Sequence, residues 1–205
     1  MGTTAAVAAP ELPVPARAAV PLPLSDDSTV QVSLPFTFRI CGQAYTSVWV
    51  NSNGNLTFGS GDTNFVESTP QFLNGQPRIA GLWDDLNPEA GGTVSYTSTQ
   101  NEFTVAFENV PEFFNSGSNT FSMTLRRSSN QIDLKYGGLT AQDGIAGVSC
   151  GGAITTGTET ERNLRTEPDQ VTHNMRGLTA FFEQFTGPAS DSVDLANYRV
   201  RFTNQ

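Results

Sequence analysis

The chain has 205 residues, of which 15% are charged, and its formal net charge is −9. This length accommodates one domain with a sizeable core, or one domain with a tail. The acidic balance, with Lys135 as the only lysine, argues against nucleic acid and anionic membranes as partners, because both require a basic surface. No apolar run reaches the roughly 18 residues of a membrane-spanning helix, so we expect no membrane insertion.

Residues 1–28 are rich in alanine, proline and valine. Repeated proline favours an extended segment over a helix. Two interpretations stay open: a linker, or a docking strand that lies on its own domain or on a neighbouring molecule. Met1 and Gly2 are not followed by the regions of a signal peptide, so we expect that a secreted native protein has already lost its signal.

From Thr29 onward, apolar residues alternate with polar ones in short runs, which is typical of strands with one buried face. The stretch "AYTSVWVNSNGNLTFG" predicts a hairpin with strands at 45–50 and 56–58, because its Asn53-Gly54 pair suits a tight turn. Further alternating runs lie at residues 30–38, 94–96, 103–107, 121–125, 132–136 and 198–202. The sequence therefore predicts, for residues 29–205, a single all-β domain: an antiparallel β-sandwich with long loops and at most one short helix.

Two stretches depart from this alternation. Residues 154–170 are polar, and we expect a long surface loop there. The segment "LTAFFEQF", residues 178–185, fits either one short helix or a strand buried on both faces.

Cys41 and Cys150 are the only cysteines. In a strand-rich chain with one lysine and one histidine, an even cysteine pair favours a disulfide over two free thiols and suggests an extracellular protein. Such a bond would close a loop of more than a hundred residues, which the chain-entropy model values at up to about 4.7 kcal/mol.

The stretch "GVSCG" matches the nucleophile elbow of a serine hydrolase, and Ser149, Asp169 and His173 follow in the order of an α/β-hydrolase. That elbow requires a strand, a sharp turn and a helix within a parallel sheet. Here poor helix formers follow Ser149, and no alternation of strands and helices is present. His173 is expected to be an exposed loop residue, and we predict that the protein is not an enzyme and has no catalytic residues.

The stretch "RIAGLWDDLNPEAGG" places Asp84 and Asp85 side by side. Neighbouring side chains on a strand point in opposite directions, so the pair is poorly suited to act together as acid and base. A calcium site formed by Asp84, Asp85 and Asn87 is a functional alternative, although the EF-hand register fails at Ala90 and Tyr96. The structural interpretation is an acidic turn that follows a buried Trp83.

Several segments, in this order, resemble a nidogen-like domain of the kind carried by bacterial secreted and surface proteins. They cover roughly residues 29–150 and read "LPFTFRICGQAYTSVWVNSNGNLTFG", "RIAGLWDDLNPEAGGTVSY", "FTVAFENVPEF", "NTFSMTLRRSSNQIDLKYGGL" and "DGIAGVS". The closing "FFEQFTG" and "VDLANYRVRF" resemble the tail that follows such modules. The family markers map onto Trp83, Asp84, Gly92 and Tyr96 as structural residues.

This resemblance implies an extracellular or cell-surface β-rich module without catalytic activity and without an obligatory cofactor. Its expected partner is a protein or glycan of a cell surface or matrix. One alternative is self-association, in which residues 1–28 add as a strand to a neighbour's sheet. Another is an accessory glycan-binding domain of a secreted hydrolase, with Phe113 and Phe114 stacking on sugar rings. The resemblance also implies that Cys41, an unusual residue at its position, forms an added bond with Cys150.

Overall fold

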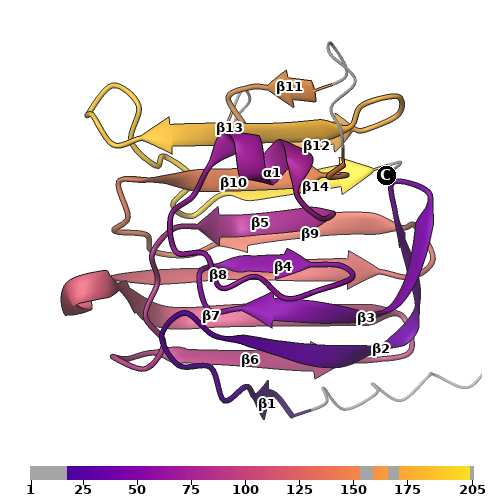
Figure 1. Ribbon diagram of the computed structural model, residues 1–205, viewed down its shortest axis with the longest axis horizontal. Helices are drawn as coiled ribbons and strands as arrows, with labels where there is room; N and C mark the ends of the chain where they lie inside the picture. Colours follow the sequence, from indigo (N-terminus) through magenta and orange to yellow (C-terminus); the bar gives the residue numbers. More distant parts are fainter. Residues whose placement is uncertain (1–17, 153–158, 166–170, 204–205) are drawn as a thin grey trace, which may run out of the picture.

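A computed structural model of the chain shows two seven-stranded sheets packed face to face (Figure 1). The structure describes residues 18–152, 159–165 and 171–203. Almost all neighbouring strands are antiparallel, which confirms the predicted all-β sandwich. Two pairs at sheet edges are parallel instead: β11 (Glu159–Glu161) with β13 (Ala180–Thr186), and β12 (Val171–Asn174) with β14 (Arg199–Thr203).

The first sheet has the order β1-β6-β7-β8-β9-β14-β12. Its strands are β1 (Val20–Pro21), β6 (Thr93–Ser98), β7 (Glu102–Glu112), β8 (Ser116–Arg126), β9 (Gln131–Tyr136), β14 (Arg199–Thr203) and β12 (Val171–Asn174). A single 3-10 turn, η1 (Phe113–Asn115), forms the tip of the β7–β8 hairpin.

The second sheet has the order β11-β13-β10-β5-β4-β3-β2. Its strands are β11 (Glu159–Glu161), β13 (Ala180–Thr186), β10 (Asp143–Ser149), β5 (Arg78–Trp83), β4 (Asn55–Thr57), β3 (Gln43–Asn51) and β2 (Thr29–Ile40). The short helix α1 (Thr69–Asn74) lies over the outer face of this sheet (Figure 1). Within the described residues, no helix is long and apolar enough to span a membrane.

The core lies between the sheets and is built from the alternating residues that the sequence predicted. Phe103, Val105 and Phe107 of β7 are all fully buried, and Phe107 stacks on Phe121 of β8 at a ring-centroid distance of 4.7 Å. The predicted hairpin is β3–β4. At its turn, a side chain on Gly54 would place its Cβ 1.8 Å from the Leu82 carbonyl oxygen, and the backbone φ is +76°, so this position requires glycine.

The β2–β3 hairpin is long and bent. The register between the two strands shifts between Ser33 and Phe38, so the distal half of the hairpin curls across one end of the sandwich (Figure 1). The curled hairpin carries Cys41 to the residue that follows β10, where Cys41 and Cys150 form a disulfide with a Cα–Cα distance of 5.5 Å. The predicted disulfide is thus present.

Three further segments fall wholly or partly within the described residues. Residues 180–186 form strand β13 rather than a helix, and Leu178 precedes it. The predicted loop at 154–170 lies partly outside the described residues, and its described part contains strand β11, which the sequence did not predict. Within the N-terminal segment, β1 pairs with β6 of the same chain and Leu24 is buried. Residues 1–17 lie outside the described part.

Candidate functional site

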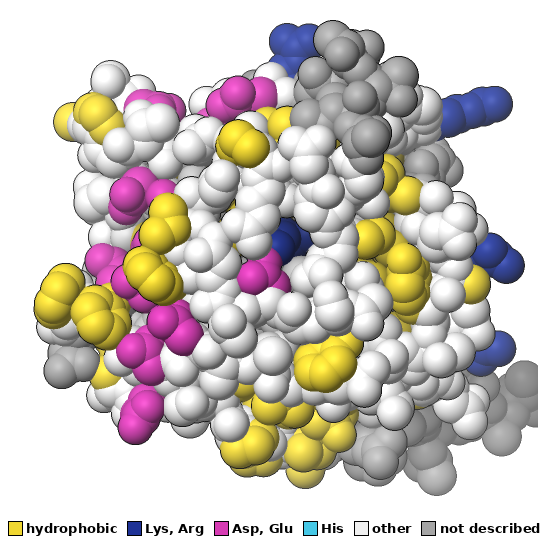
Figure 2. All heavy atoms as spheres, viewed as in Figure 1, with side chains coloured by type: hydrophobic (Ala, Val, Ile, Leu, Met, Phe, Trp, Pro, Cys, Tyr) yellow, Lys and Arg dark blue, Asp and Glu magenta, His cyan; other side chains and the backbone are white. Residues whose placement is uncertain are grey.

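Carboxylates gather at one end of the sandwich, which we call the acidic end. It consists of the loop before β2, the loop after β5 and the neighbouring strand ends. Its acidic residues are Asp26, Asp27, Glu67, Asp84, Asp85, Glu89, Glu112 and Asp143. Figure 2 shows acidic and exposed hydrophobic side chains together on the side of the molecule where the tip of the β7–β8 hairpin projects in Figure 1.

Asp84 and Asp85, which follow Trp83 in the chain, have side chains in different environments. The Asp84 side chain is buried, and its Oδ1 accepts a hydrogen bond from the Asp85 amide at 2.7 Å. The Asp85 carboxylate is half-buried and lies within 4.8 Å of Asp26 and Asp27. Trp83 itself is fully buried. The structure therefore agrees with an acidic turn behind a buried tryptophan, and it does not bring the two carboxylates together as an acid–base pair.

The three residues that the sequence proposed as calcium ligands, Asp84, Asp85 and Asn87, do not share one set of contacts in the structure. Asp85 lies in a cluster of carboxylates, but with Asp26 and Asp27 rather than with Asp84. The Asn87 side-chain oxygen accepts a hydrogen bond from the Ala90 amide at 3.0 Å, so it is engaged within its own turn. Calcium binding at Asp85 stays a prediction, and calorimetric titration of calcium into the protein and into D85N would test it. No pattern in the sequence pointed to Asp26 and Asp27, which lie nearly sixty residues away along the chain.

The acidic end contains carboxyl groups that are shifted toward their neutral forms. Burial, together with the negative charges of Asp143, Glu67 and Glu112, raises the pKa of Asp84 to about 7. Burial and the neighbouring Asp27 also raise the pKa of Asp26. Folding therefore places these groups where the charged form costs free energy.

We expect the Asp84→Asn variant to be more stable than the wild type above pH 7, by about 2–4 kcal/mol at roughly 1.4 kcal/mol per pKa unit. The folded-state pKa of Asp84 lies above its ordinary value of 3.8. The native state therefore holds a proton that the unfolded state loses, and its stability falls as pH rises from about 4 to 7. Asparagine keeps the oxygen that accepts the Asp85 amide and carries no charge. Urea denaturation between pH 4 and pH 8 measures the difference.

The Glu183→Gln variant is the matched control for this measurement. Burial, with the charges of Asp194, Asp191 and Glu161, raises the pKa of Glu183 to about 7 as well, and its Oε2 accepts the Leu164 amide at 2.6 Å. Each variant should remove the part of the pH dependence of the unfolding free energy that its own carboxyl group causes. A D84N protein with the same pH profile as the wild type would contradict the prediction.

Two aromatic side chains stand at the tip of the β7–β8 hairpin, beside the acidic end. Phe113 and Phe114 are 38% and 88% exposed, and their rings meet edge to face with centroids 4.5 Å apart. Phe114 has a backbone φ of +64°, a left-handed conformation that is unfavourable for a bulky residue. The tip is anchored to the acidic turn, because the Phe113 amide donates a hydrogen bond to the Asp85 carbonyl at 2.7 Å.

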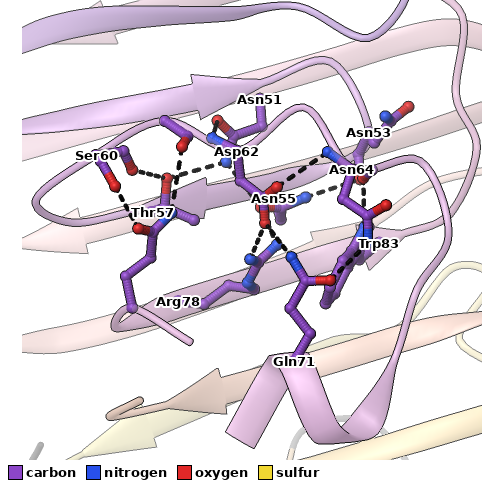
Figure 3. Close-up of polar contacts among 12 residues, drawn as sticks. Asn51, Asn53, Asn55, Thr57, Ser60, Asp62, Asn64, Gln71, Arg78 and Trp83 are labelled. Carbon is purple, nitrogen blue, oxygen red and sulfur yellow. Dashed lines mark hydrogen bonds and ion pairs between the residues drawn. The ribbon is translucent and has the colours of Figure 1, made fainter. Parts of the chain in front are cut away.

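A buried polar layer lies between the second sheet and the segment that covers it (Figure 3). Arg78 of β5 is 1% exposed and forms an ion pair with Asp62. Its guanidinium carbon lies 3.9 Å from the centroid of the Trp83 ring, and its Nη1 donates to Asn55 Oδ1 at 2.8 Å. Gln71 of α1 donates to the same Asp62 carboxylate at 3.0 Å.

Asn53 connects the polar layer to the acidic end. Its amide nitrogen donates to Asp27 Oδ1 at 2.8 Å, and its side-chain oxygen accepts the Leu86 amide at 3.0 Å. The hairpin turn at Asn53 thus orients both acidic loops. Sequence reasoning missed this layer, because asparagine and arginine side chains ordinarily indicate exposed positions.

The two described residues of the hydrolase-like motif, Ser149 and His173, lie in different sheets. Ser149 is fully buried in β10 of the second sheet, and its Oγ accepts the Gly151 amide at 3.1 Å. His173 lies in β12 of the first sheet and is buried against Phe181 and Phe202, so its expected place in an exposed loop was wrong. Burial lowers the pKa of His173. Asp169 lies outside the described residues.

Comparison with known proteins identifies a family. Neither a search of curated proteins nor a search of solved structures finds a protein similar to this chain. The sequence pattern of the NIDO-related family matches residues 11–192, which includes nearly all of the sandwich. The chain therefore belongs to the NIDO-related, or nidogen-related, family.

Proposed function

We propose that the chain is a non-catalytic extracellular module that binds a partner at a cell surface or in a matrix through its aromatic tip and the acidic end beside it. Membership of the NIDO-related family and the Cys41–Cys150 disulfide support an extracellular location. The exposed Phe114 is the observation that carries the binding role.

Phe114 is costly to the isolated domain in two ways. Its left-handed backbone costs of the order of 1 kcal/mol or more, and its 88% exposed ring forgoes about 2 kcal/mol of apolar burial. Aromatic residues are enriched among those that contribute most to protein interfaces. A bulky ring held out from a hairpin tip therefore fits a contact residue better than a packing residue.

The Phe114→Asn variant should bind at least tenfold more weakly than the wild type to the surface or matrix of the producing cells. Asparagine tolerates a left-handed backbone, so the tip should keep its shape and the domain its stability. Binding of fluorescently labelled protein to intact cells measures the effect. The Val20→Ala variant is the control, since Val20 is 41% exposed on β1 and belongs to a different strand. Equal binding by F114N and the wild type would remove the proposed contact.

Glycan binding is a second candidate that the same tip favours. The Phe114 ring is accessible enough to stack on a sugar, as expected for an accessory module of a secreted hydrolase. Phe113 supports that ring from the side rather than forming a flat platform with it, because the two rings meet edge to face. A glycan array probed with the wild type and F114N tests this candidate, and an array without hits would remove it.

Self-association, in which the part of residues 1–28 that precedes β1 adds as a strand to a neighbour's sheet, is the third candidate. Strand β2 favours it, because its 12 residues form the outermost strand of the second sheet and pair with β3. Proline at position 35 and the shifted register interrupt this edge. A molecular-mass measurement of the chain with and without residues 1–17 tests strand addition, and an unchanged monomer would end the idea.

A further inference from the structure

Basic side chains gather at the end of the sandwich opposite the acidic end, which we call the basic end. It includes the β2–β3 turn, the β8–β9 turn and the adjoining parts of β8 and β14. Its basic residues are Arg39, Arg126, Arg127, Arg199 and Arg201, and its described carboxylates are Glu102 and Asp133. The two turns lie side by side, since Asn130 exchanges hydrogen bonds with the backbone of Arg39 at 3.1 and 2.8 Å.

The basic end carries more positive charge than its own carboxylates neutralise. Asp133 is 3% exposed, and it accepts hydrogen bonds from Arg126, Arg199 and Arg201 at 2.6–3.3 Å. Arg39 and Arg127 are both exposed, and each donates to a nearby backbone carbonyl, at 3.1 and 3.4 Å. Their charges face solvent on a molecule whose net charge is −9.

The β7–β8 hairpin sets the separation between the two ends. Its tip, at Phe113–Asn115, lies at the acidic end, and its open end pairs Glu102 with Arg126. Strands of 11 residues at about 3.4 Å per residue separate these ends by roughly 30–35 Å. This distance exceeds the screening length of about 8 Å in physiological salt, so the two ends do not neutralise each other within one molecule. In Figure 2 most acidic side chains lie on the left of the view and most basic side chains lie on the right, apart from an acidic and a basic side chain that meet near the centre and a basic side chain at the top.

We propose that a second copy of this chain docks head to tail, with the acidic end and Phe114 of one molecule seated on the basic end of the next. The proposal rests on the proposed function, because it makes the aromatic tip a contact that builds an assembly. Guanidinium groups pair with carboxylates and also stack on aromatic rings, so one basic surface can satisfy both features of the acidic end. A contact between two different ends continues from molecule to molecule and generates an open chain or a ring.

The complementary surface is present on the chain itself, and this favours a second copy over an acidic polysaccharide. A highly charged polyanion would approach against the negative field of the whole molecule. Between two copies, the contacting ends have opposite signs and the other charges are screened beyond about 8 Å.

The test is sedimentation velocity of the purified full chain at 10–500 μM in EDTA, in 50 mM and in 500 mM NaCl. Head-to-tail docking predicts concentration-dependent oligomers that weaken at least tenfold at the higher salt. The R39E/R127E variant alters only exposed side chains of the basic end and leaves the arginines around Asp133 in place. The E89K/D143K variant alters exposed carboxylates of the acidic end. Each variant alone should be monomeric.

One mixture and one quadruple variant separate a specific contact from a general effect of net charge. In an equimolar mixture of R39E/R127E and E89K/D143K, the two intact ends form the wild-type contact and the two reversed ends form the charge-exchanged contact. The mixture should therefore build alternating oligomers, although neither variant associates alone. The quadruple variant keeps the wild-type net charge, since the changes of −4 and +4 cancel, and it should associate again through exchanged charges. F114N should weaken association of the wild type without changing its salt dependence.

Three results would overturn the proposal. The first is a wild type that stays monomeric throughout in 50 mM NaCl. The second is association that persists in both charge-reversal variants but is lost when residues 1–17 are deleted, which assigns it to strand addition instead. The third is a monomer that binds immobilised alginate or heparin through Arg39 and Arg127, which assigns the basic end to a polyanion. The experiment uses purified protein alone, so a monomeric result leaves the cell-binding test of F114N unaffected.

Discussion

Replacement of both cysteines by alanine is expected to lower the free energy of unfolding by about 4 kcal/mol. The Cys41–Cys150 bond spans 109 residues along the chain, and the chain-entropy model assigns about 4.7 kcal/mol to a loop near this length. The bond also holds the bent β2–β3 hairpin over the end of the core, where Phe38 and Ile40 are fully buried. Urea denaturation of C41A/C150A and of the wild type at pH 7 measures the loss.

Reduction provides the control for this prediction. A reducing agent should lower the stability of the wild type to that of C41A/C150A and leave the variant unchanged. Cys41 has a left-handed backbone with φ of +51°. Alanine at position 41 has the same unfavourable backbone conformation, so the difference in stability between the wild type and C41A/C150A reports the disulfide alone. A wild type whose urea midpoint is unaffected by reduction, with the thiols shown to be free, would contradict the expected stabilisation.

The strands of the sandwich core were predictable from the sequence because one face of each strand meets the core and the other meets solvent. The run Phe103, Val105 and Phe107 is an example, since the intervening residues of β7 are polar or small and partly exposed. The Asn53-Gly54 turn was predictable for a different reason: its backbone needs φ angles that glycine adopts freely. In both cases the cause acts over a few neighbouring residues.

Strand β13 could not be distinguished from a helix, because both of its faces are covered. Phe182 packs on Phe72 of helix α1, with ring centroids 5.2 Å apart, while Phe185 lies in the core between the sheets. A strand buried on both faces shows no polar–apolar alternation. Its identity therefore depended on a helix more than a hundred residues earlier, which local periodicity does not report.

The candidate site was predictable only in part, because it too depends on contacts between residues that are far apart in the sequence. The turn at Asp84 and Asp85 was visible as an acidic stretch after a tryptophan. The partners of Asp85 are Asp26 and Asp27. These come from the loop before β2, an edge strand of the second sheet, whereas Asp85 follows β5, its central strand. Arg78 gave no signal either, since a single arginine that opens an apolar strand resembles an exposed strand end. Only the fold shows that it is covered by the segment containing Asp62.

Replacement of Asp62 by alanine is expected to destabilise the protein by about 3–5 kcal/mol, because it leaves the buried Arg78 guanidinium without its counter-ion. Arg78 is 1% exposed and cannot recover the lost pairing from water. Burial already lowers the pKa of this guanidinium, and Asp62 opposes that shift. The same change deprives Gln71 of an acceptor, so helix α1 should loosen from the second sheet. Urea denaturation at pH 7 gives the free energy of unfolding.

Two further variants separate the ion pair from general effects of substitution. Glu108 is an exposed carboxylate, so E108A should change the free energy of unfolding by less than about 0.5 kcal/mol. The double variant D62A/R78M removes both charges and should recover part of the loss, since an uncompensated buried charge costs more than an absent pair. Because Arg78 lies over the Trp83 ring, its removal should also alter the tryptophan fluorescence of the folded protein. Two results would contradict this prediction: a loss of less than about 1 kcal/mol in D62A, or a D62A/R78M protein that is less stable than D62A. In either case the segment that covers the second sheet would be held by its apolar contacts, chiefly Phe72 on Phe182, and not by the ion pair.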